Sequence, residues 1–236
     1  MVYWPGDPDM PFDKVIEQDE AANAAGKPIK HVIFDFGNVL ITWDPAAALL
    51  PRYDKSIVEQ FLDNNVSGFY DYNDLTDEGA SLDEVVARMR AEKGDKWADI
   101  YQYYLDNFED TLTGVVPGSR ALVRDLQEAG IGTWGLSNWE SVTFAQADRY
   151  CPVLKALDDR VVSGFVNMRK PNLDIYQYAL EKFGIEAQDC IFLDDKAMNI
   201  IAANKCGIRG IRFSNAQRAR EILIELGVSI PSVCYY

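Results

Sequence analysis

Short apolar runs that alternate with amphipathic helical segments are the feature that most restricts the fold of this chain. Such runs are typical of strands buried on both faces of a parallel sheet. They cover residues 29–34, 131–136, 161–162, 190–193 and 208–213. Helices that each end at a glycine are predicted over residues 117–129, 171–183, 199–206 and 217–226. The sequence therefore predicts an α/β fold with a doubly wound, Rossmann-like parallel sheet as its core.

Residues 45–114 interrupt this alternation, since they hold several helical stretches and no convincing strand. Ser81 and Glu84 form a capping-box pattern, and Val85, Val86 and Met89 follow on one helix face. Aromatic side chains recur here at helical spacings, which favours a helix–helix core over stacking against a substrate. We therefore predict an N-terminal extension (1–28), a core domain (29–44 and 115–236) and a small α-helical cap domain (45–114).

Charge and hydropathy exclude several classes of partner. Lys and Arg number 23 against 37 Asp and Glu, and the net charge of −14 repels nucleic-acid phosphates and anionic lipids. The longest apolar window, residues 31–43, is interrupted by Asp35 and Asn38 and is shorter than the roughly 20 residues of a membrane span. Residues 1–28 lack the basic start and apolar core of a secretory signal. We expect a cytoplasmic protein that binds neither nucleic acid nor membranes, and its oligomeric state stays open.

The cysteines do not form a metal-binding or redox pattern. Cys151, Cys190, Cys206 and Cys234 show no CxxC spacing, and His31 is the only histidine. A zinc site or a Cys–His nucleophile pair is therefore not expected, and the cysteines are predicted to be reduced residues that pack in the interior.

Polar residues stand directly after the predicted strands or in the loops beyond them. They are Asp35, Ser137, Lys170 and the pair Asp194–Asp195. Each one alone has a structural explanation as a helix cap, a turn residue or a solvated charge. A parallel sheet, however, gathers the carboxyl ends of its strands at one edge, which is where open α/β sheets bind their ligands. The coincidence of all four positions favours an active site at that edge.

These positions also form a pattern of motifs that resembles the haloacid dehalogenase superfamily. The four motifs occur in order at residues 35–39, 137–138, 170–171 and 194–195, and the segments 168–176 and 192–200 have the family's spacing as well as its residue types. The resemblance spans residues 29–214. Within the family, the chain most resembles the subgroup with a small helical cap, which includes bacterial α-glucose-1-phosphate phosphatases and the phosphatase domain of epoxide hydrolases. The resemblance implies a hydrolase of small phosphorylated metabolites, with a sugar phosphate as the expected substrate.

In the roles that the resemblance implies, Asp35 is the nucleophile and, with the backbone carbonyl of Gly37 and the side chain of Asp195, a ligand of Mg²⁺. Asp194 belongs to the same acidic cluster and is expected to lie behind the ligands. Ser137 and the backbone amide of Asn138 would bind phosphoryl oxygens, and Lys170 would supply positive charge. The chemistry of the residues agrees, because three carboxylates suit a divalent cation and would raise one another's pKa without one. An aspartyl-phosphate intermediate, hydrolysed by water, is then expected.

Gly37 departs from the family's usual pattern. Most phosphatases of the family carry an Asp two residues after the nucleophile as general acid and base, and such help contributes roughly 10²- to 10⁴-fold. The glucose-1-phosphate subgroup that the chain resembles also has Asp-x-Gly-Asn here. Asp44 is a possible substitute, although a helix cap before Pro45 is the favoured interpretation. Gly37 is also a position where a positive φ would explain the glycine.

Two alternatives stay open. A 2-haloacid dehalogenase also uses an Asp nucleophile and resembles the chain around Lys170 and Tyr176, but such enzymes use no metal and carry a Ser-type motif where Asp194–Asp195 stands. The second alternative is a binding protein that kept the fold and lost catalytic turnover because Gly37 replaces the acid. Substrate selection is expected from the cap, with Phe69, Tyr70, Asp71 and Arg88 as the candidate residues.

Overall fold

The computed structural model describes residues 10–233, and it shows an α/β fold built on a six-stranded sheet in the order β1-β8-β7-β2-β5-β6. Five neighbouring strands are parallel, as predicted. The edge strand β1 runs antiparallel to β8, a pairing that the sequence did not indicate. The strands of this sheet are β1 (Val15–Ile16), β2 (His31–Phe34), β5 (Gly132–Ser137), β6 (Asp159–Val162), β7 (Cys190–Asp194) and β8 (Arg209–Arg212).

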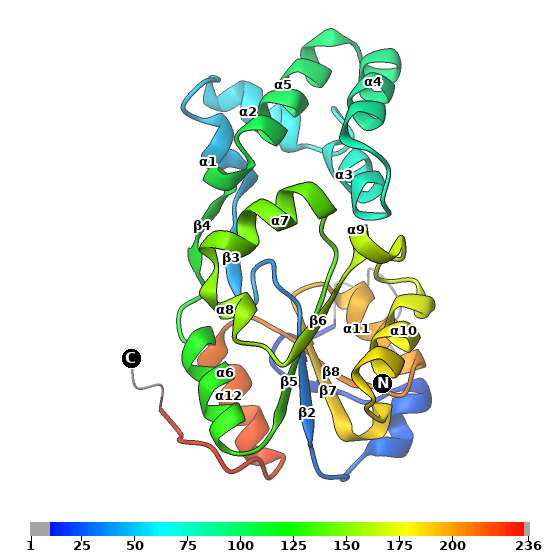
Figure 1. The fold of residues 1–236 in the computed structure, drawn as a ribbon, viewed down its shortest axis with the longest axis vertical. Helices are drawn as coiled ribbons and strands as arrows, with labels where there is room; N and C mark the ends of the chain where they lie inside the picture. The colour runs from blue at the N-terminus through cyan, green and yellow to red at the C-terminus, as the bar shows by residue number, and fades with distance from the viewer. Residues whose placement is uncertain (1–9, 234–236) are drawn as a thin grey trace.

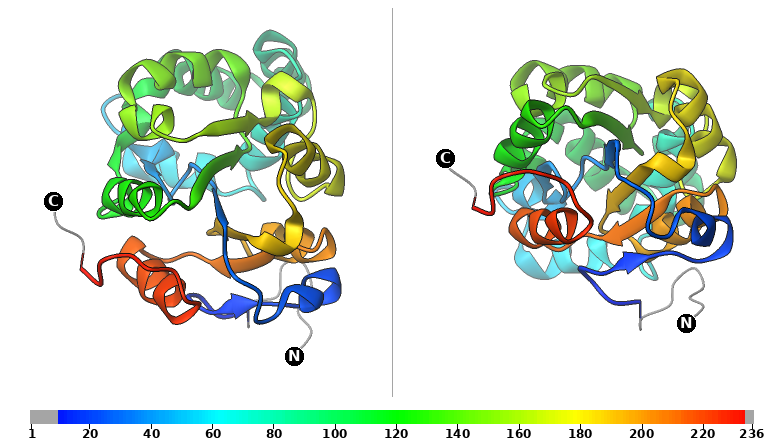
Figure 2. Two further views of the ribbon diagram at one scale, coloured as in Figure 1. Left: turned by 60° about the horizontal axis from the view of Figure 1, so that its bottom comes forward. Right: turned by 90° about the horizontal axis from the view of Figure 1, so that it is seen from below.

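Helices cover both faces of the sheet, as the doubly wound prediction requires (Figure 2). Helices α6 (Ser119–Glu128) and α12 (Ala216–Glu225) lie on one face, and α10 (Leu173–Phe183) and α11 (Ala197–Lys205) lie on the other. Because successive side chains of a strand point to opposite faces, Val32 and Phe34 of β2 pack in the first layer and Ile33 packs in the second.

A separate helical layer stands above the carboxyl edge of the sheet (Figure 1). We call this layer the cap. Its buried centre is largely aromatic, and the rings of Phe69 and Tyr104 meet edge to face with centroids 5.1 Å apart. The capping box of Ser81 and Glu84 is present as predicted. The cap helices are α1 (Pro45–Leu49), α2 (Lys55–Leu62), α3 (Phe69–Asp77), α4 (Leu82–Lys93) and α5 (Asp95–Asp106).

A two-stranded antiparallel ribbon joins the cap to the core. It consists of β3 (Ile41–Trp43) and β4 (Leu112–Val115). The expectation of no strand in residues 45–114 was therefore wrong at its C-terminal end. The reason is that Thr113 and Gly114 give β4 no apolar run, so it forms a strand only because β3 lies beside it.

The described part of the N-terminal extension packs on the core. Strand β1 and the 3-10 helix η1 (Asp19–Ala24) lie against β8 and α11, and Met10, Ile16 and Ala21 are buried. The boundaries of two predicted helices also shift. Pro117 lies before α6 rather than in its first turn, and α11 begins at Ala197.

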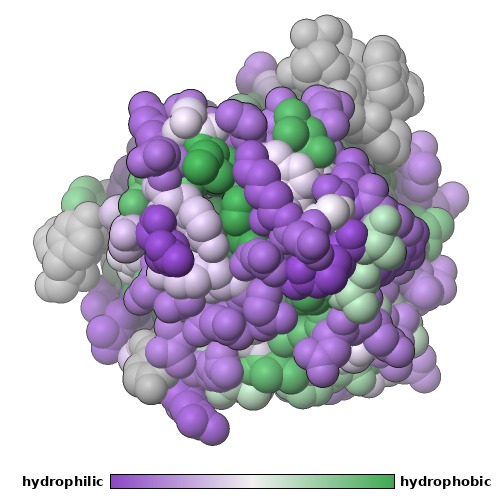
Figure 3. Space-filling model, turned by 90° about the horizontal axis from the view of Figure 1, so that it is seen from above, coloured by the Kyte–Doolittle hydropathy of each residue, from purple (hydrophilic) through white to green (hydrophobic). Residues whose placement is uncertain are grey.

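The remaining helices connect these layers. They are α7 (Ser141–Tyr150), α8 (Pro152–Lys155), α9 (Ser163–Val166) and the 3-10 helices η2 (Phe108–Thr111) and η3 (Ala187–Asp189). Within residues 10–233, no helix has the length and apolar character that a membrane crossing requires. Cys151, Cys190 and Cys206 are free thiols, while Cys234 lies outside the described residues. The surface at the cap end of the molecule is mainly hydrophilic, with hydrophobic residues gathered in a few small areas (Figure 3).

Candidate active site

The four sequence motifs meet at the carboxyl edge of the sheet. Asp35 directly follows β2, Ser137 ends β5 and Asp194 ends β7, and these three strands are neighbours. The loop between α9 and α10 adds Lys170, and Asp195 follows β7. One pocket between the core and the cap is lined by all of the predicted site residues except Asp194, which lies beneath it.

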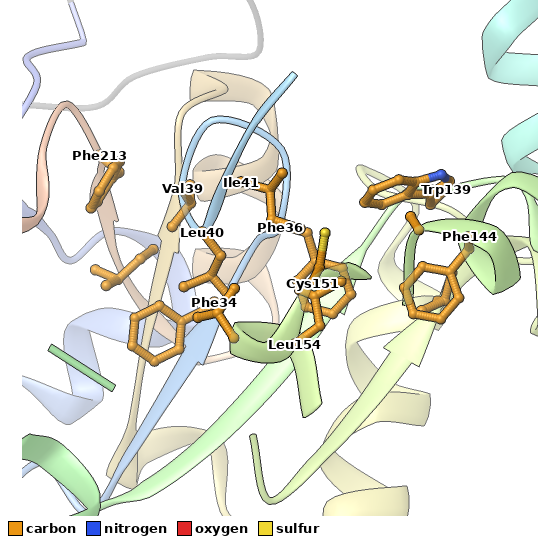
Figure 4. Packing of buried hydrophobic residues seen from close by; sticks show 14 of the residues in the cluster. Phe34, Phe36, Val39, Leu40, Ile41, Trp139, Phe144, Cys151, Leu154 and Phe213 are labelled. Carbon is orange, nitrogen blue, oxygen red and sulfur yellow. The ribbon is translucent and has the colours of Figure 1, made fainter. Parts of the chain in front are cut away.

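The loop after Asp35 is fixed by apolar anchors below the pocket. Phe36, Val39 and Leu40 are fully buried, and the ring of Phe36 stacks on that of Phe144 with centroids 6.0 Å apart (Figure 4). The backbone amides of Leu40 and Ile41 both donate to the Phe36 carbonyl oxygen, at 2.9 Å. The alternation of this motif therefore leaves Asp35 on the pocket side while its apolar neighbours hold the turn in place.

Lys170 links Asp35 to Asp194. Its Nζ lies 2.8 Å from Asp35 Oδ1 and donates to Asp194 Oδ2 at 2.7 Å and to the Leu136 carbonyl oxygen at 2.9 Å. The side chain of Lys170 is 1% exposed. A buried ammonium group with three acceptors is held in one position, so its charge stays at the Asp35 carboxylate.

The electrostatics of this group favour a charged lysine. Burial by itself lowers the pKa of Lys170, but Asp194 and Asp35 outweigh it, so that the pKa lies above its usual value. Burial raises the pKa of Asp35, and Lys170 opposes that rise only in part, while Asp194 adds to it. One lysine does not balance the carboxylates gathered here, and a further cation would favour their ionised forms.

Asp194 is fully occupied by protein donors. Its Oδ1 accepts from the Lys196 amide at 2.8 Å, and the Asn199 side-chain amide donates to both carboxylate oxygens, at 3.0 and 2.9 Å. With Lys170 as the fourth contact, the Asp194 carboxylate is turned into the protein. Its place behind the other carboxylates agrees with the expected arrangement. The role of Asn199 was not predicted, because only the fold shows that its side chain faces Asp194.

Asp195 differs from Asp194 although the two are adjacent. Among the described residues, no hydrogen-bond donor contacts its side-chain oxygens, and burial, followed by the charges of Asp194 and Asp35, raises its pKa to about 7. Asp35, Asp194 and Asp195 each offer an oxygen within 4.8 Å of the others. An all-oxygen cluster with a carboxylate that lacks a protein donor fits Mg²⁺. The residues present can therefore hold the metal that the sequence predicted.

Gly37 is not required by backbone strain. Its φ lies outside the left-handed region, and a Cβ atom built there meets no atom within 4 Å. The explanation of Gly37 by a positive φ was therefore wrong. The strained residue is the next one, because Asn38 has φ 59° and its Oδ1 accepts from the Trp43 amide at 3.2 Å. An asparagine tolerates this conformation better than most residues do.

Asn138 and Lys170 hold each other through a reciprocal contact. The Asn138 side-chain amide donates to the Lys170 carbonyl oxygen at 2.8 Å, and the Lys170 backbone amide donates to Asn138 Oδ1 at 2.8 Å. The side chain of Asn138 is thereby occupied and fixes the Lys170 loop. Ser137 is buried, and its Oγ has only a long contact of 3.4 Å, to the Asn138 carbonyl oxygen. This hydroxyl can still donate to a ligand in the pocket.

Asp44 acts as a helix cap. Its side chain is exposed and accepts from the Ala46 amide at 3.0 Å at the start of α1. It does not line the pocket. The interpretation of Asp44 as a cap rather than a replacement acid agrees with this geometry.

The cap supplies an aromatic wall and a carboxyl group that sequence reasoning missed. Of the four cap candidates only Tyr70 lines the pocket, whereas Phe69 is buried in the cap and Asp71 and Arg88 are exposed elsewhere. The missed residue is Asp77, the last residue of α3, which lines the pocket and is 7% exposed. The other aromatic lining residues are Trp43, Tyr104, Phe108 and Trp139. No local signal distinguishes Asp77 from the other acidic residues of α3.

The chain is similar to known hydrolases. The sequence profile of the haloacid dehalogenase-like hydrolase family matches residues 29–207. The curated protein "Sesquiterpene phosphatase astK" of Aspergillus oryzae is 26% identical over 197 residues, which cover 79% of this chain and 91% of that protein. "Glyceraldehyde 3-phosphate phosphatase" of Pyrococcus furiosus is 22% identical over 210 residues, which cover 81% and 83%.

A solved structure of similar fold comes from Bacteroides thetaiotaomicron. It is a haloacid dehalogenase family enzyme, an Asp-to-Ala variant in complex with magnesium and inorganic phosphate. It superposes with a TM-score of 0.61 at 18% identity and covers 80% of this chain and 95% of that one.

Proposed function

The chain belongs to the haloacid dehalogenase-like hydrolase family, and from that premise we propose that it is a Mg²⁺-dependent phosphomonoesterase that acts through an aspartyl-phosphate intermediate. The observation that carries the proposal is the buried contact of Asp35 with Lys170 beside the unpartnered carboxylate of Asp195. In this proposal the core (29–44 and 115–236) performs the chemistry, and the cap (45–114) selects the substrate. The site of action is the cytoplasm.

In the first step, a carboxylate oxygen of Asp35 attacks phosphorus and the bond to the leaving oxygen breaks. Lys170 keeps its charge beside both the nucleophile and the arriving phosphoryl group. The hydroxyl of Ser137 and the backbone amide of Asn138 donate to phosphoryl oxygens, because these donors stand at the end of the strand next to β2. Water then attacks phosphorus and releases Asp35 and inorganic phosphate.

The metal site in this proposal consists of Asp35, the backbone carbonyl of Gly37 and Asp195. Bound Mg²⁺ supplies positive charge that offsets the repulsion between the Asp35 carboxylate and a phosphate dianion. Asp194 holds Lys170 and does not act as a ligand, since all of its contacts are to protein donors. The structural relative in complex with magnesium and inorganic phosphate supports a magnesium-dependent reaction.

For the substrate we propose a small phosphorylated metabolite, with a sugar phosphate first. Asn73 and Lys196 line the pocket together with aromatic rings, a combination that can bind hydroxyl groups and the apolar face of a sugar ring. The phosphate of an apolar alcohol is the second candidate, because the wall formed by Trp43, Tyr104 and Phe108 is apolar. The similarity to a protein named glyceraldehyde 3-phosphate phosphatase supports the sugar phosphate. The similarity to a protein named sesquiterpene phosphatase supports the phosphate of an apolar alcohol.

The acidic cluster disfavours a metal-free dehalogenase. Two carboxylates, Asp194 and Asp195, stand at the end of β7, and within residues 10–233 no hydrogen-bond donor contacts the second one. A non-catalytic binding protein is also disfavoured, because the pocket keeps Asp35 and Lys170 in direct contact.

Hydrolysis of an aryl phosphate with and without Mg²⁺, by wild type and by Asp35→Asn, tests the proposal. We expect metal-dependent turnover in the wild type and less than about 1% of it in Asp35→Asn, since an amide is a poor nucleophile. Asp44→Asn is the matched control, because Asp44 lies in the same segment but outside the pocket and asparagine caps helices equally well.

The same assay identifies the substrate class. Hexose phosphates, triose phosphates, a prenyl monophosphate and a 2-haloacid are compared at equal concentration. Turnover of the haloacid without metal, or full activity in Asp35→Asn, would contradict the proposal.

A further inference from the structure

Gly37 leaves the proposed reaction without the usual proton donor to the leaving oxygen. A leaving alkoxide is a strong base, so its departure is slow unless an acid in the site protonates it. The acid has to reach the leaving-group side of the pocket, which lies toward the cap because Asp35 follows β2 on the core side. The candidates are the titratable groups that line the pocket.

Several of these groups are already engaged. Asp74 on α3 pairs with Arg169, with 2.6 Å between its Oδ2 and Nη2. Glu140 caps α7, where its two carboxylate oxygens accept from the amides of residues 142 and 143 at 2.7 and 2.8 Å. Lys170 is fixed between carboxylates. Burial raises the pKa of Tyr104 well above its ordinary value, so its phenol is a weak proton donor near neutral pH.

Asp77 is the carboxyl group on the cap side that is not engaged. It is the last residue of α3, is 7% exposed and lines the same pocket as Asp35 and Gly37. In the part of the chain that the structure describes, no hydrogen bond or ion pair holds its carboxyl group. Burying a carboxyl group without a partner is costly, so such a position is more readily explained by a ligand than by stability.

The charged groups around Asp77 come from four segments. Asp74 on its own helix and Glu140 before α7 add negative charge, while Lys196 before α11 and Arg169 before α10 add positive charge. Burial is the strongest influence, and it raises the pKa of Asp77 to about 7. An acid with a pKa near the pH of the cell can both give and take a proton.

We propose that the carboxyl group of Asp77 is the proton donor to the leaving oxygen, in place of the acid that Gly37 does not provide. The inference rests on the proposed phosphatase function. Asp77 is then a catalytic residue that the cap contributes, and the core site is incomplete without the cap.

Asp77 gives a proton in the first step and regains one in the second. As the Asp35 oxygen bonds to phosphorus and the ester P–O bond breaks, the proton of Asp77 moves to the leaving oxygen, which departs as an alcohol. In the second step, the Asp77 carboxylate takes a proton from the attacking water while the bond between phosphorus and Asp35 breaks. The products are inorganic phosphate, free Asp35 and protonated Asp77.

The test compares phosphate esters whose leaving groups range from acidic phenols to simple alcohols. We expect Asp77→Asn to lose about 10²- to 10⁴-fold in kcat/KM on alkyl phosphates and less than about tenfold on the most activated aryl phosphate, which needs no acid. Asp71→Asn is the matched control, because it removes a carboxylate from the exposed side of the same helix. Equal losses on all esters would show a merely structural role and overturn the proposal.

A second variant, tested in the wild-type background, does not depend on the folding of Asp77→Asn. Because a side chain fits at position 37, Gly37→Asp introduces the usual acid. In the wild-type background it is expected to raise alkyl phosphate hydrolysis by less than about tenfold, since Asp77 already donates, whereas in Asp77→Asn it restores most of the lost rate. A gain above about 100-fold in the wild-type background would overturn the proposal.

Failure of the inference and failure of the proposed function are distinguishable. If the wild type hydrolyses aryl phosphates with Mg²⁺ but Asp77→Asn shows no selective loss, only the inference fails. If Tyr70→Phe shows the selective loss instead, the donor is Tyr70. Absence of any hydrolysis by the wild type would overturn both.

Discussion

Replacing Asp77 by asparagine is expected to change how the stability of the metal-free protein depends on pH. We expect the variant to gain free energy of unfolding relative to the wild type as the pH rises. Burial raises the pKa of Asp77 from 3.8 to about 7, and one pKa unit corresponds to about 1.4 kcal/mol. The ionised carboxylate therefore lowers the free energy of unfolding by about 4 kcal/mol once the pH exceeds 7. Below pH 4 the group is protonated in both the folded and the unfolded chain, so this penalty is absent there.

The sign follows from proton binding. Between pH 4 and 7 the unfolded chain releases the Asp77 proton while the folded protein keeps it, so unfolding becomes more favourable as the pH rises. Asparagine has no such proton. The buried amide costs about 1–3 kcal/mol without a partner, but that cost is the same at both pH values.

Urea unfolding of wild type and Asp77→Asn at pH 4.5 and pH 8 with EDTA measures the effect. The difference in unfolding free energy between the two proteins is expected to change by about 3–4 kcal/mol in favour of Asp77→Asn at the higher pH. Asp71→Asn, at an exposed position, is expected to show a change below about 0.5 kcal/mol. An equal difference at both pH values would refute the reasoning, as would a change in the opposite direction.

Two further outcomes are expected from the contacts of buried charges. In calorimetric titrations, Asp195→Asn weakens Mg²⁺ binding more than Asp194→Asn, because the Asp194 carboxylate is already filled by protein donors; the reverse order would exchange their roles. Arg220→Met lowers the free energy of unfolding by about 3 kcal/mol in urea melts, because Asp125 Oδ2, 2.7 Å from Arg220 Nη2, loses its buried partner while Arg124 still pairs with Oδ1 of the same carboxylate. The double variant Asp125→Asn/Arg220→Met is expected to regain part of that loss, and full additivity would contradict a direct pairing.

Local patterns were sufficient to predict most of the core. The apolar runs that became β2, β5 and β7 could only be buried as central strands, and the order of strands and helices then required a parallel sheet. Asp35 and Ser137 could be placed at the same edge because the direction of a strand fixes where its last residue lies. The family resemblance, read from the spacing of four motifs, is confirmed by the profile match.

Pairings that depend on a neighbour could not be predicted in this way. Strand β1 has only two residues and strand β4 lacks an apolar run, so each forms only because β8 or β3 offers hydrogen bonds beside it. The mutual contact of Asn138 and Lys170 joins residues 32 positions apart, and no local rule connects them.

The sequence by itself determined the fold class and the edge of the sheet at which the residues of the four motifs meet. Only the tertiary structure distinguished Asp77 from the other acidic residues of the cap. The physical reason is that the properties of a carboxyl group depend on its burial and on the charges around it, and for Asp77 these come from residues 140, 169 and 196. Those segments lie far away in the chain and meet α3 only in the folded protein.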